Sequence, residues 1–173
     1  AWKLRQKSSM VFQNYNLFQH RTVLENITDP LIHAKKMNKE DAKRRAVELL
    51  QMVGLEEKAG QYPRKLSGGQ QQRVGIARAM AVEPKVILFD EPTSSLDPEL
   101  VKEVLRVIKR LSDQKQTMVI VTHEMQFAKL ISDKIVFLDD AVIQEEGSTK
   151  ELFENSENVR LRNFLQAISL DDL

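Results

Sequence analysis

Two short apolar runs constrain the fold of this chain more than any other feature. Residues 86–89 read VILF and residues 118–121 read MVIV, and both runs are rich in branched side chains. Runs of this kind are typical of strands that are buried on both faces of a parallel sheet. Between them Asp97 suits a helix N-cap and Pro98 suits the first helical turn. The apolar face of that helix is expected at Leu100, Val101, Val104, Leu105, Ile108 and Leu111. The pattern predicts a β-α-β unit and therefore an α/β fold.

The flanking segments add a hairpin and a helical region. Residues 135–138 read IVFL and residues 142–146 read VIQEE, with a turn at Asp139-Asp140, so we expect a hairpin at one sheet edge. The first half reads as helices, and the clearest helix begins after Asn38 and ends at Gly54. Its apolar stripe is expected at Ala42, Ala46, Leu49, Leu50 and Val53.

Composition excludes several classes of protein. The 173 residues contain 26 Lys and Arg against 25 Asp and Glu, so no global field attracts nucleic acid or an anionic membrane. A basic cluster at residues 35–45 is interrupted by Glu40 and Asp41 and has no interleaved aromatics, which favours a solvated face. The absence of cysteine excludes disulfides, thiolate catalysis and Cys-based zinc sites. No apolar run approaches the roughly 18–20 residues of a membrane span, so we expect a cytoplasmic chain without membrane insertion.

Polar side chains follow the two predicted parallel strands. Asp90 and Glu91 come directly after one strand, and Thr122 and His123 after the other. In open α/β sheets ligands bind beyond the carboxyl ends of the strands, so an acid pair and an imidazole are expected at one crevice. Because side chains alternate along a strand, Asp90 and Glu91 should point differently, which would let one hold a metal while the other handles water. The alternative is a polar strand exit at Asp90-Glu91 and a helix cap at His123.

The stretch KLSGGQQQR, residues 65–73, has two interpretations. Ser67 and Gln70 have the spacing of a capping box, so a helix should begin there. Capping does not need Gly68 and Gly69, because glycine costs roughly 1 kcal/mol relative to alanine inside a helix. The glycines favour a backbone that something must approach closely, and a bare helix N-terminus favours phosphate.

Four segments together resemble the ATP-binding-cassette (ABC) family. They are MVFQNYNLFQHRTVLENI (residues 10–27), LSGGQQQR (66–73), VILFDEPTSSLDPE (86–99) and VTHEM (121–125), which resemble the Q-loop, the signature sequence, the Walker B segment with its D-loop, and the switch histidine. The resemblance implies a P-loop NTPase-like (RecA-like) parallel sheet core, here incomplete, with an inserted α-helical subdomain. The Q-loop segment is most similar to ATPase subunits of polar amino-acid importers.

The resemblance implies a catalytic centre that uses ATP and Mg²⁺. Asp90 would hold Mg²⁺, usually through water, and Glu91 would be the general base that orients the attacking water. His123 would contact the γ-phosphate. Gln13 would sense both the metal and the attacking water.

The resemblance also assigns residues to a second subunit's nucleotide. Ser67, Gly68, Gly69 and Gln70 would meet the γ-phosphate of ATP held mainly by the opposite subunit of a head-to-tail homodimer. Asp97 would lie in the loop that crosses that interface.

The resemblance further implies a division of the chain and a set of partners. Residues 1–13 would end the N-terminal core, residues 14–83 would form the helical subdomain, and residues 84–173 would complete the core. The helical subdomain would dock transmembrane permease subunits on the inner face of the cell membrane, with no role for nucleic acid.

The sequence departs from the family pattern in one major respect. The P-loop, G-x-x-x-x-G-K-[ST], should precede the Q-loop, yet no glycine is followed by lysine anywhere in the chain. We therefore expect the C-terminal part of a cassette, with an unsatisfied sheet edge, exposed apolar surface and no activity on its own. Gln19 stands where importers usually have proline, and Ala141 stands where glycine is common, which makes a positive φ in the hairpin turn less expected.

Two other functions remain open at this point. One is a soluble ABC-type ATPase of DNA maintenance or translation, which the absence of a long coiled coil or basic arm disfavours. The other is a non-catalytic interaction module, which only the missing P-loop supports.

Overall fold

The computed structural model describes residues 7–171 and divides into two compact units, the first ending at Thr122 and the second beginning at His123. The strands and helices of the first unit are β1 (Ser8–Val11), α2 (Val23–His33), α3 (Lys39–Met52), α4 (Gly68–Ala81), β2 (Val86–Asp90), α5 (Pro98–Asp113) and β3 (Thr117–Val121). Two short 3₁₀ helices, η1 (Glu56–Lys58) and η2 (Pro63–Lys65), lie between α3 and α4.

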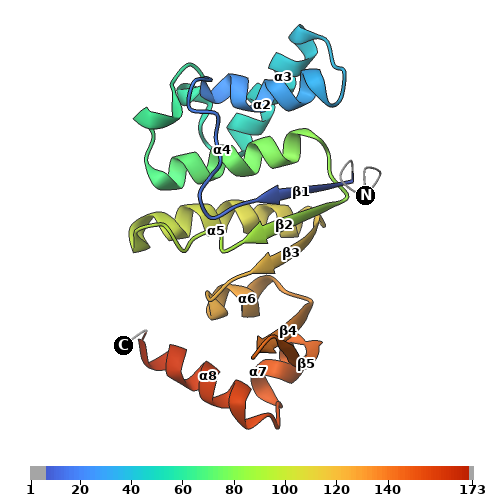
Figure 1. Ribbon diagram of the computed structural model, residues 1–173, viewed down its shortest axis with the longest axis vertical. Helices are drawn as coiled ribbons and strands as arrows, with labels where there is room; N and C mark the ends of the chain where they lie inside the picture. Colours follow the sequence, from blue (N-terminus) through green and yellow to red (C-terminus); the bar gives the residue numbers. More distant parts are fainter. Residues whose placement is uncertain (1–6, 172–173) are drawn as a thin grey trace. The chain divides into compact units, whose positions relative to one another are not determined.

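A three-stranded parallel sheet is the centre of the first unit, in the order β1-β2-β3 (Figure 1). Val11 of β1 lies opposite Phe89 of β2, and Asp90 of β2 lies opposite Val121 of β3. The predicted β-α-β unit is confirmed as β2-α5-β3. Strand β1 was not predicted, and it places the segment that follows it at the same sheet edge as the end of β2.

Three helices, α2, α3 and α4, pack against one another and form the helical region. Helix α3 begins as predicted, because the Asn38 side chain accepts a hydrogen bond from the Asp41 N–H at 2.9 Å. The five predicted stripe residues are all buried, and Gly54 follows the helix with a φ of 67°. A glycine tolerates this left-handed conformation, so the helix ends where the sequence indicated.

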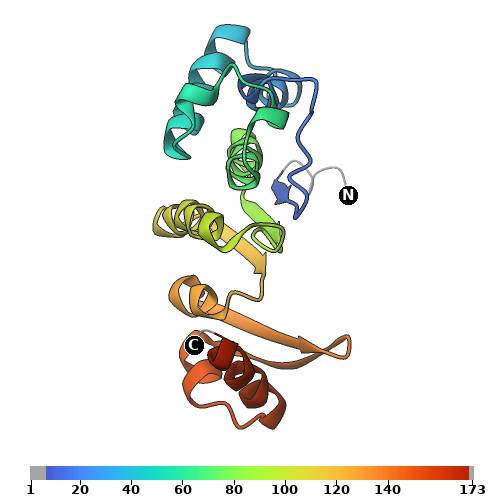
Figure 2. The ribbon, with the colours of Figure 1, turned by 90° about the vertical axis from the view of Figure 1, so that its left-hand side faces the viewer.

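The two faces of the parallel sheet have different surroundings. Helices α4 and α5 lie on one side of the strands (Figure 2), where the side chains of Val11, Ile87 and Phe89 are buried. The buried residues of α5 are Val104, Val107, Ile108 and Leu111. This list includes Val107, which the expected apolar face omitted, and it lacks Leu100, Val101 and Leu105, which that face included.

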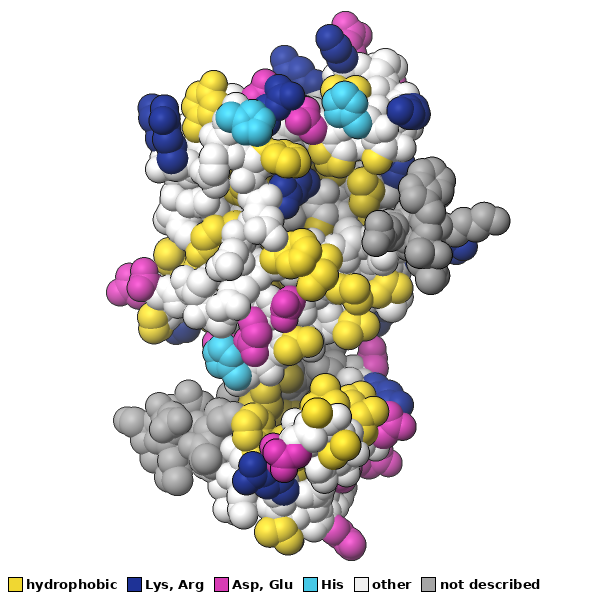
Figure 3. All heavy atoms as spheres, in the orientation of Figure 1, with side chains coloured by type: hydrophobic (Ala, Val, Ile, Leu, Met, Phe, Trp, Pro, Cys, Tyr) yellow, Lys and Arg dark blue, Asp and Glu magenta, His cyan; other side chains and the backbone are white. Residues whose placement is uncertain are grey.

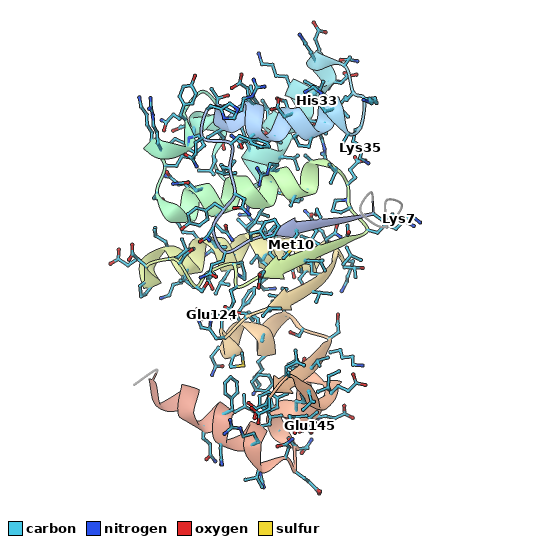
Figure 4. All side chains as sticks on the ribbon, in the orientation of Figure 1. Lys7, Met10, His33, Lys35, Glu124 and Glu145 are labelled. Atoms are coloured by element: carbon cyan, nitrogen blue, oxygen red, sulfur yellow. The ribbon has the colours of Figure 1, made fainter. Side chains whose placement is uncertain are left out.

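The opposite face of the sheet is open in the described part of the first unit. Val119 and Val121 are 55% and 54% exposed, and Met10, labelled in Figure 4, is 40% exposed. Hydrophobic side chains gather over the strands in Figure 3. The prediction that both runs are buried on both faces is therefore wrong for Val119 and Val121. Successive side chains alternate between faces, and only one face has helices packed on it.

The second unit contains a hairpin and three helices. Its elements are α6 (Met125–Ile131), β4 (Lys134–Asp139), β5 (Val142–Ser148), α7 (Thr149–Glu154) and α8 (Val159–Asp171). The hairpin forms an antiparallel two-stranded sheet of its own and was expected at an edge of a larger one. Asp140 and Ala141 have φ values of 50° and 60°, so the expectation against a positive φ at Ala141 is wrong. A two-residue turn needs positive φ at both positions to match the twist of the strands, whichever residues occupy it.

Candidate active site

Two of the candidate loops leave the parallel sheet at the same edge. Because β1 and β2 are parallel and Val11 lies opposite Phe89, the loop with Gln13 follows β1 beside the point where Asp90 ends β2. The side chains of Gln13 and Asp90 are both exposed. The structure thus brings together two segments that the resemblance assigns to one catalytic centre.

Glu91 has an unusual backbone. Its φ is 44°, a left-handed conformation that costs a non-glycine residue roughly 1–2 kcal/mol. Its N–H donates to the Val121 carbonyl at 3.0 Å, and its own carbonyl accepts from Ser94 Oγ at 3.0 Å. Strand β2 therefore ends at Asp90, and a fixed turn sets the direction of the Glu91 side chain.

Asp90 fits the role of a carboxylate ligand for Mg²⁺. Its carboxylate is exposed at the strand end, and carboxylate oxygens are ligands that this ion prefers. Within residues 7–171, no group of three or more His, Cys, Asp or Glu side chains is arranged to hold a metal. Mg²⁺ commonly binds through one or two carboxylates together with nucleotide phosphates and water, so one carboxylate at this position suits a metal that arrives with a nucleotide.

Helix α4, which we call the signature helix, begins with the predicted capping box. Ser67 Oγ accepts from the Gln70 N–H at 3.3 Å, and Gln70 Oε1 accepts from the Ser67 N–H at 3.1 Å. The first turn of this helix contains no acidic residue. Its positive end is therefore not neutralised by a side chain of its own first turn.

The chain itself accounts for both glycines of the signature helix. A Cβ added at Gly68 would lie 2.6 Å from Tyr15 Oη and 3.0 Å from Leu96 Cδ2. A Cβ added at Gly69 would lie 3.1 Å from Leu100 Cβ. Close packing within the chain thus favours glycine at both positions, and the approach of a phosphate to this backbone stays a prediction.

Asp97 occupies the N-cap position of α5, as predicted, and Pro98 is the first residue of the helix. The Asp97 side chain makes no capping hydrogen bond and is exposed. Its carboxylate therefore does not cap the helix that it precedes.

His123 is the first residue of the second unit and its side chain is exposed. Helix α6 begins at Met125 with Glu124 as its N-cap, so the alternative of a histidine cap is wrong. The grouping of His123 with Asp90 and Glu91 stays a prediction.

Buried Asn26 supports the loop that follows the Gln13 segment, and the sequence analysis missed it. Asn26 Oδ1 accepts from the Phe18 N–H at 2.8 Å, and Asn26 Nδ2 donates to the carbonyls of Phe18 at 3.1 Å and Thr22 at 2.9 Å. A polar side chain on the same helical face as Val23 and Ile27 was the signal that could have revealed it.

Comparison with known proteins identifies the family. The family model for ABC transporters matches residues 1–94. The probable amino-acid import ATP-binding protein YxeO of Bacillus subtilis is 54% identical over 97% of this chain and 68% of its own length. The L-cystine transport system ATP-binding protein TcyN of Escherichia coli is 57% identical over 97% of this chain and 67% of its own length.

A solved structure agrees with the sequence relatives. The ATP-binding cassette MJ0796, a dimer in a post-hydrolysis state bound to ADP and Pi, superposes with a TM-score of 0.74 and 39% identity. The match covers 86% of this chain and 66% of that cassette. The chain thus spans about two thirds of the length of these relatives. It has the α/β fold of their cassettes, and it belongs to the ABC transporter ATPase family.

Proposed function

We propose that this chain is the ATP-binding, ATP-hydrolysing component of an ABC importer that takes up a small polar solute, and that the solute is an amino acid. The similarity to amino-acid import ATP-binding proteins over 97% of the chain carries this proposal. Relatives named for cystine and arginine import are similarly close, so the similarity does not choose one amino acid.

In the proposed reaction Asp90 and Glu91 have separate tasks. Mg²⁺ would neutralise charge on the transferred phosphoryl group when it is bound with ATP. Asp90 would hold that ion, usually through water, from the end of β2. Glu91 would accept a proton from the attacking water, and positioned general bases contribute roughly 10²–10⁴ in rate. Gln13 would contact the metal and the water, and His123 would contact the γ-phosphate.

The signature helix would act on a nucleotide held by another subunit. The chain contains no G-x-x-x-x-G-K-[ST] sequence, whereas the N-terminal end of α4 is the positive end of the helix dipole and has no acidic residue in its first turn, which suits phosphate. Ser67, Gly68, Gly69 and Gln70 would contact the γ-phosphate in a head-to-tail dimer, and Asp97 would lie at the interface. The dimeric state of the superposed cassette supports this arrangement.

The same relatives support a permease partner. Import needs a path across the membrane, yet none of the helices in residues 7–171 is long and apolar enough to span one. We propose that transmembrane permease subunits supply the path and that the helical region of about residues 14–83 docks on them. The protein would then work in the cytoplasm at the inner face of the cell membrane.

None of the relatives described above is named for DNA maintenance or translation, so no observation favours that alternative.

A chimaera tests the proposed function. In it, this chain replaces the matching two thirds of the E. coli protein TcyN, whose remaining third is kept. The chimaera should hydrolyse Mg-ATP, and Glu91→Gln should reduce turnover by roughly 10²-fold or more while ATP binding persists, because the amide keeps the shape but cannot take a proton.

Glu57→Gln is the matched control, because Glu57 is an exposed glutamate of η1. It should hydrolyse ATP at the parental rate. An inactive parental chimaera that is folded would contradict the proposed function, and a Glu91→Gln variant with parental turnover would contradict the role of Glu91.

A further inference from the structure

We propose that Tyr15 is a positioning residue, which sets the place of the first turn of the signature helix and links that turn to the loop before α5. The positioning role is argued from contacts within the first unit. Its consequence for catalysis rests on the proposed function.

Tyr15 lies in a strained turn after β1. Tyr15 and Asn16 have φ values of 55° and 49°, and each left-handed residue of this kind costs roughly 1–2 kcal/mol. Such strain persists only where the surroundings hold it.

Arg78 of the signature helix holds the strained turn. Its Nη1 donates to the Asn16 carbonyl at 2.8 Å, and its Nη2 lies 3.4 Å from the Tyr15 carbonyl. Burial lowers the pKa of Arg78, but a guanidinium stays charged across the physiological range, so both carbonyls face a permanent cation. The Arg78 guanidinium also lies over the Phe18 ring, 5.5 Å from its centroid. The turn is therefore fixed to α4 near the C-terminal end of that helix.

The Tyr15 side chain reaches the other end of the same helix. Its hydroxyl occupies the space that a Cβ would need at Gly68, at 2.6 Å, whereas its Cζ would lie at an ordinary 3.5 Å. On the tyrosine side, therefore, only the hydroxyl oxygen lies too close for a Cβ at Gly68. Together with Arg78, this contact ties one strained turn to both ends of α4.

Ser95 extends the connection to the loop before α5. Ser95 Oγ lies 3.0 Å from the Gln13 carbonyl and 3.3 Å from Tyr15 Oη. A serine hydroxyl has one hydrogen, so Tyr15 donates to Ser95 while Ser95 donates to Gln13. Leu96, the next residue, also contacts the site of the missing Cβ at 3.0 Å.

These contacts make Tyr15 the meeting point of three segments that carry candidate site residues. The segments are the loop with Gln13, the signature helix that begins at Ser67, and the loop that ends at Asp97. A displacement of the loop that ends at Asp97 moves Ser95 and Leu96. Because Tyr15 contacts both Ser95 and the Cβ position of Gly68, the same displacement also moves Gly68. Tyr15 touches none of the reacting groups in this arrangement, so its role is to place others.

Hydrogen exchange on the 173-residue chain tests the positioning directly. The amides of Gln70 and Gln71 donate to Ser67 Oγ and the Ser67 carbonyl, so they report the first turn of α4. Tyr15→Phe and Ser95→Ala should each accelerate their exchange about fivefold, and the double variant should add little, because both remove one shared link. The amides of α3 should exchange at unchanged rates. Unchanged exchange at Gln70 and Gln71 in both variants would overturn the proposal.

A pair of glycine variants provides a second test. Gly68→Ala should lower the melting temperature, and adding Tyr15→Phe should restore much of the loss by removing the oxygen at 2.6 Å. Gly60→Ala is the control, since an added Cβ there would meet nothing within 4 Å. If Gly68→Ala does not fold, its recovery by Tyr15→Phe is scored as folded yield. Failure of Tyr15→Phe to improve Gly68→Ala in either measure would overturn the proposal.

The chimaera separates this proposal from the proposed function. Tyr15→Phe should lower the turnover number for ATP about threefold or more with little change in KM, because ground-state nucleotide contacts are untouched. An inactive parental chimaera contradicts the proposed function alone, while exchange and melting still decide the role of Tyr15. An active chimaera with equal turnover in both forms would overturn the catalytic consequence of Tyr15.

Discussion

Helices α2 and α4 begin with the same hydrogen bonds, but only α2 has a charged side chain in its capping box. In α2 the Thr22 N–H donates to Glu25 Oε2 at 2.7 Å, and the Glu25 N–H donates to Thr22 Oγ1 at 3.2 Å. In α4 the same two bonds join Ser67 and Gln70 at 3.1 and 3.3 Å. The third position holds a carboxylate in α2 and a neutral amide in α4.

The carboxylate changes what a helix end can do. The hydrogen bond from the Thr22 backbone, together with that from the Thr22 side chain, lowers the pKa of Glu25, so its charge is held at the positive helix end. Helix α7 repeats this arrangement with Ser148 and Glu151, and backbone hydrogen bonding there lowers the pKa of Glu151. In α4 the Gln70 amide completes the capping box, but it carries no charge that would neutralise the positive end of the helix dipole. Among these three helices with a capping box, α4 alone is capped without a carboxylate in its first turn, which is the condition that our proposal of phosphate binding requires.

The largest effect, on ATP turnover, is expected from giving the capping box of α4 the carboxylate that α2 has. Gln70→Glu keeps both hydrogen bonds but places a negative charge where the γ-phosphate is proposed to lie. ATP turnover of the chimaera should fall by about tenfold or more, because like charges at close range repel. Steady-state hydrolysis measures this, with the melting temperature as the check on folding.

The reverse change, Glu25→Gln, is the matched control for that experiment. It gives α2 the amide of α4 and should leave turnover within about twofold, because it removes a charge remote from the proposed phosphate contact. Equal turnover of Gln70→Glu and its parent would show that the uncharged end of α4 has no part in catalysis.

A smaller effect is expected from removing the cap residue of either box. Ser67→Ala and Thr22→Ala should each lower the free energy of unfolding by about 1 kcal/mol, because each leaves a helix N–H without its acceptor. Denaturant titration of the 173-residue chain measures both. Similar decreases in the free energy of unfolding would establish that the two capping boxes stabilise their helices equally. An unchanged free energy in Ser67→Ala would show that α4 does not depend on its capping box.

The smallest effect is a difference in acid sensitivity. The folded pKa of Glu25 is lowered, so its contribution to stability is present above its unfolded pKa, near 4.5, and is lost as the pH falls through that value toward the folded pKa. The melting temperature of the parent should therefore fall more between pH 6 and pH 3 than that of Glu25→Gln. Gln70→Glu should gain acid sensitivity of the same sign. Identical pH profiles for the parent and Glu25→Gln would refute this origin of the difference.

Local signals in the sequence predicted three helix starts and the β-α-β unit. Asn38, Ser67 and Asp97 each occupy the N-cap position that the sequence indicated, because capping depends on residues within one turn. The strands β2 and β3 followed from their apolar runs. Strand β1 was not predicted because it has only four residues, SSMV, and half of them are polar.

Features that depend on contacts between residues far apart in the sequence could not be predicted from local signals. An apolar run reads the same whether a face is covered or open, so the runs themselves did not indicate that Val119 and Val121 are exposed. Only the absence of the P-loop motif led us to expect exposed apolar surface. The positive φ of Ala141 is imposed by the length of the turn rather than by the residue. The neighbours of Gly68 and Gly69 come from segments far along the chain, so the sequence showed that space is needed there without showing what fills it.

Calorimetric titration of the 173-residue chain with Mg-ATP tests the central claim most directly. The claim is that this chain contributes the signature helix, Asp90 and Glu91 to a nucleotide whose phosphates are cradled by a loop outside these residues. A phosphate nest supplies most of the ground-state contacts to ATP, and the sequence contains no G-x-x-x-x-G-K-[ST] motif, so we expect no binding in the micromolar range. The chimaera that adds the remaining third of TcyN should bind. Micromolar affinity of the 173-residue chain alone would contradict the account.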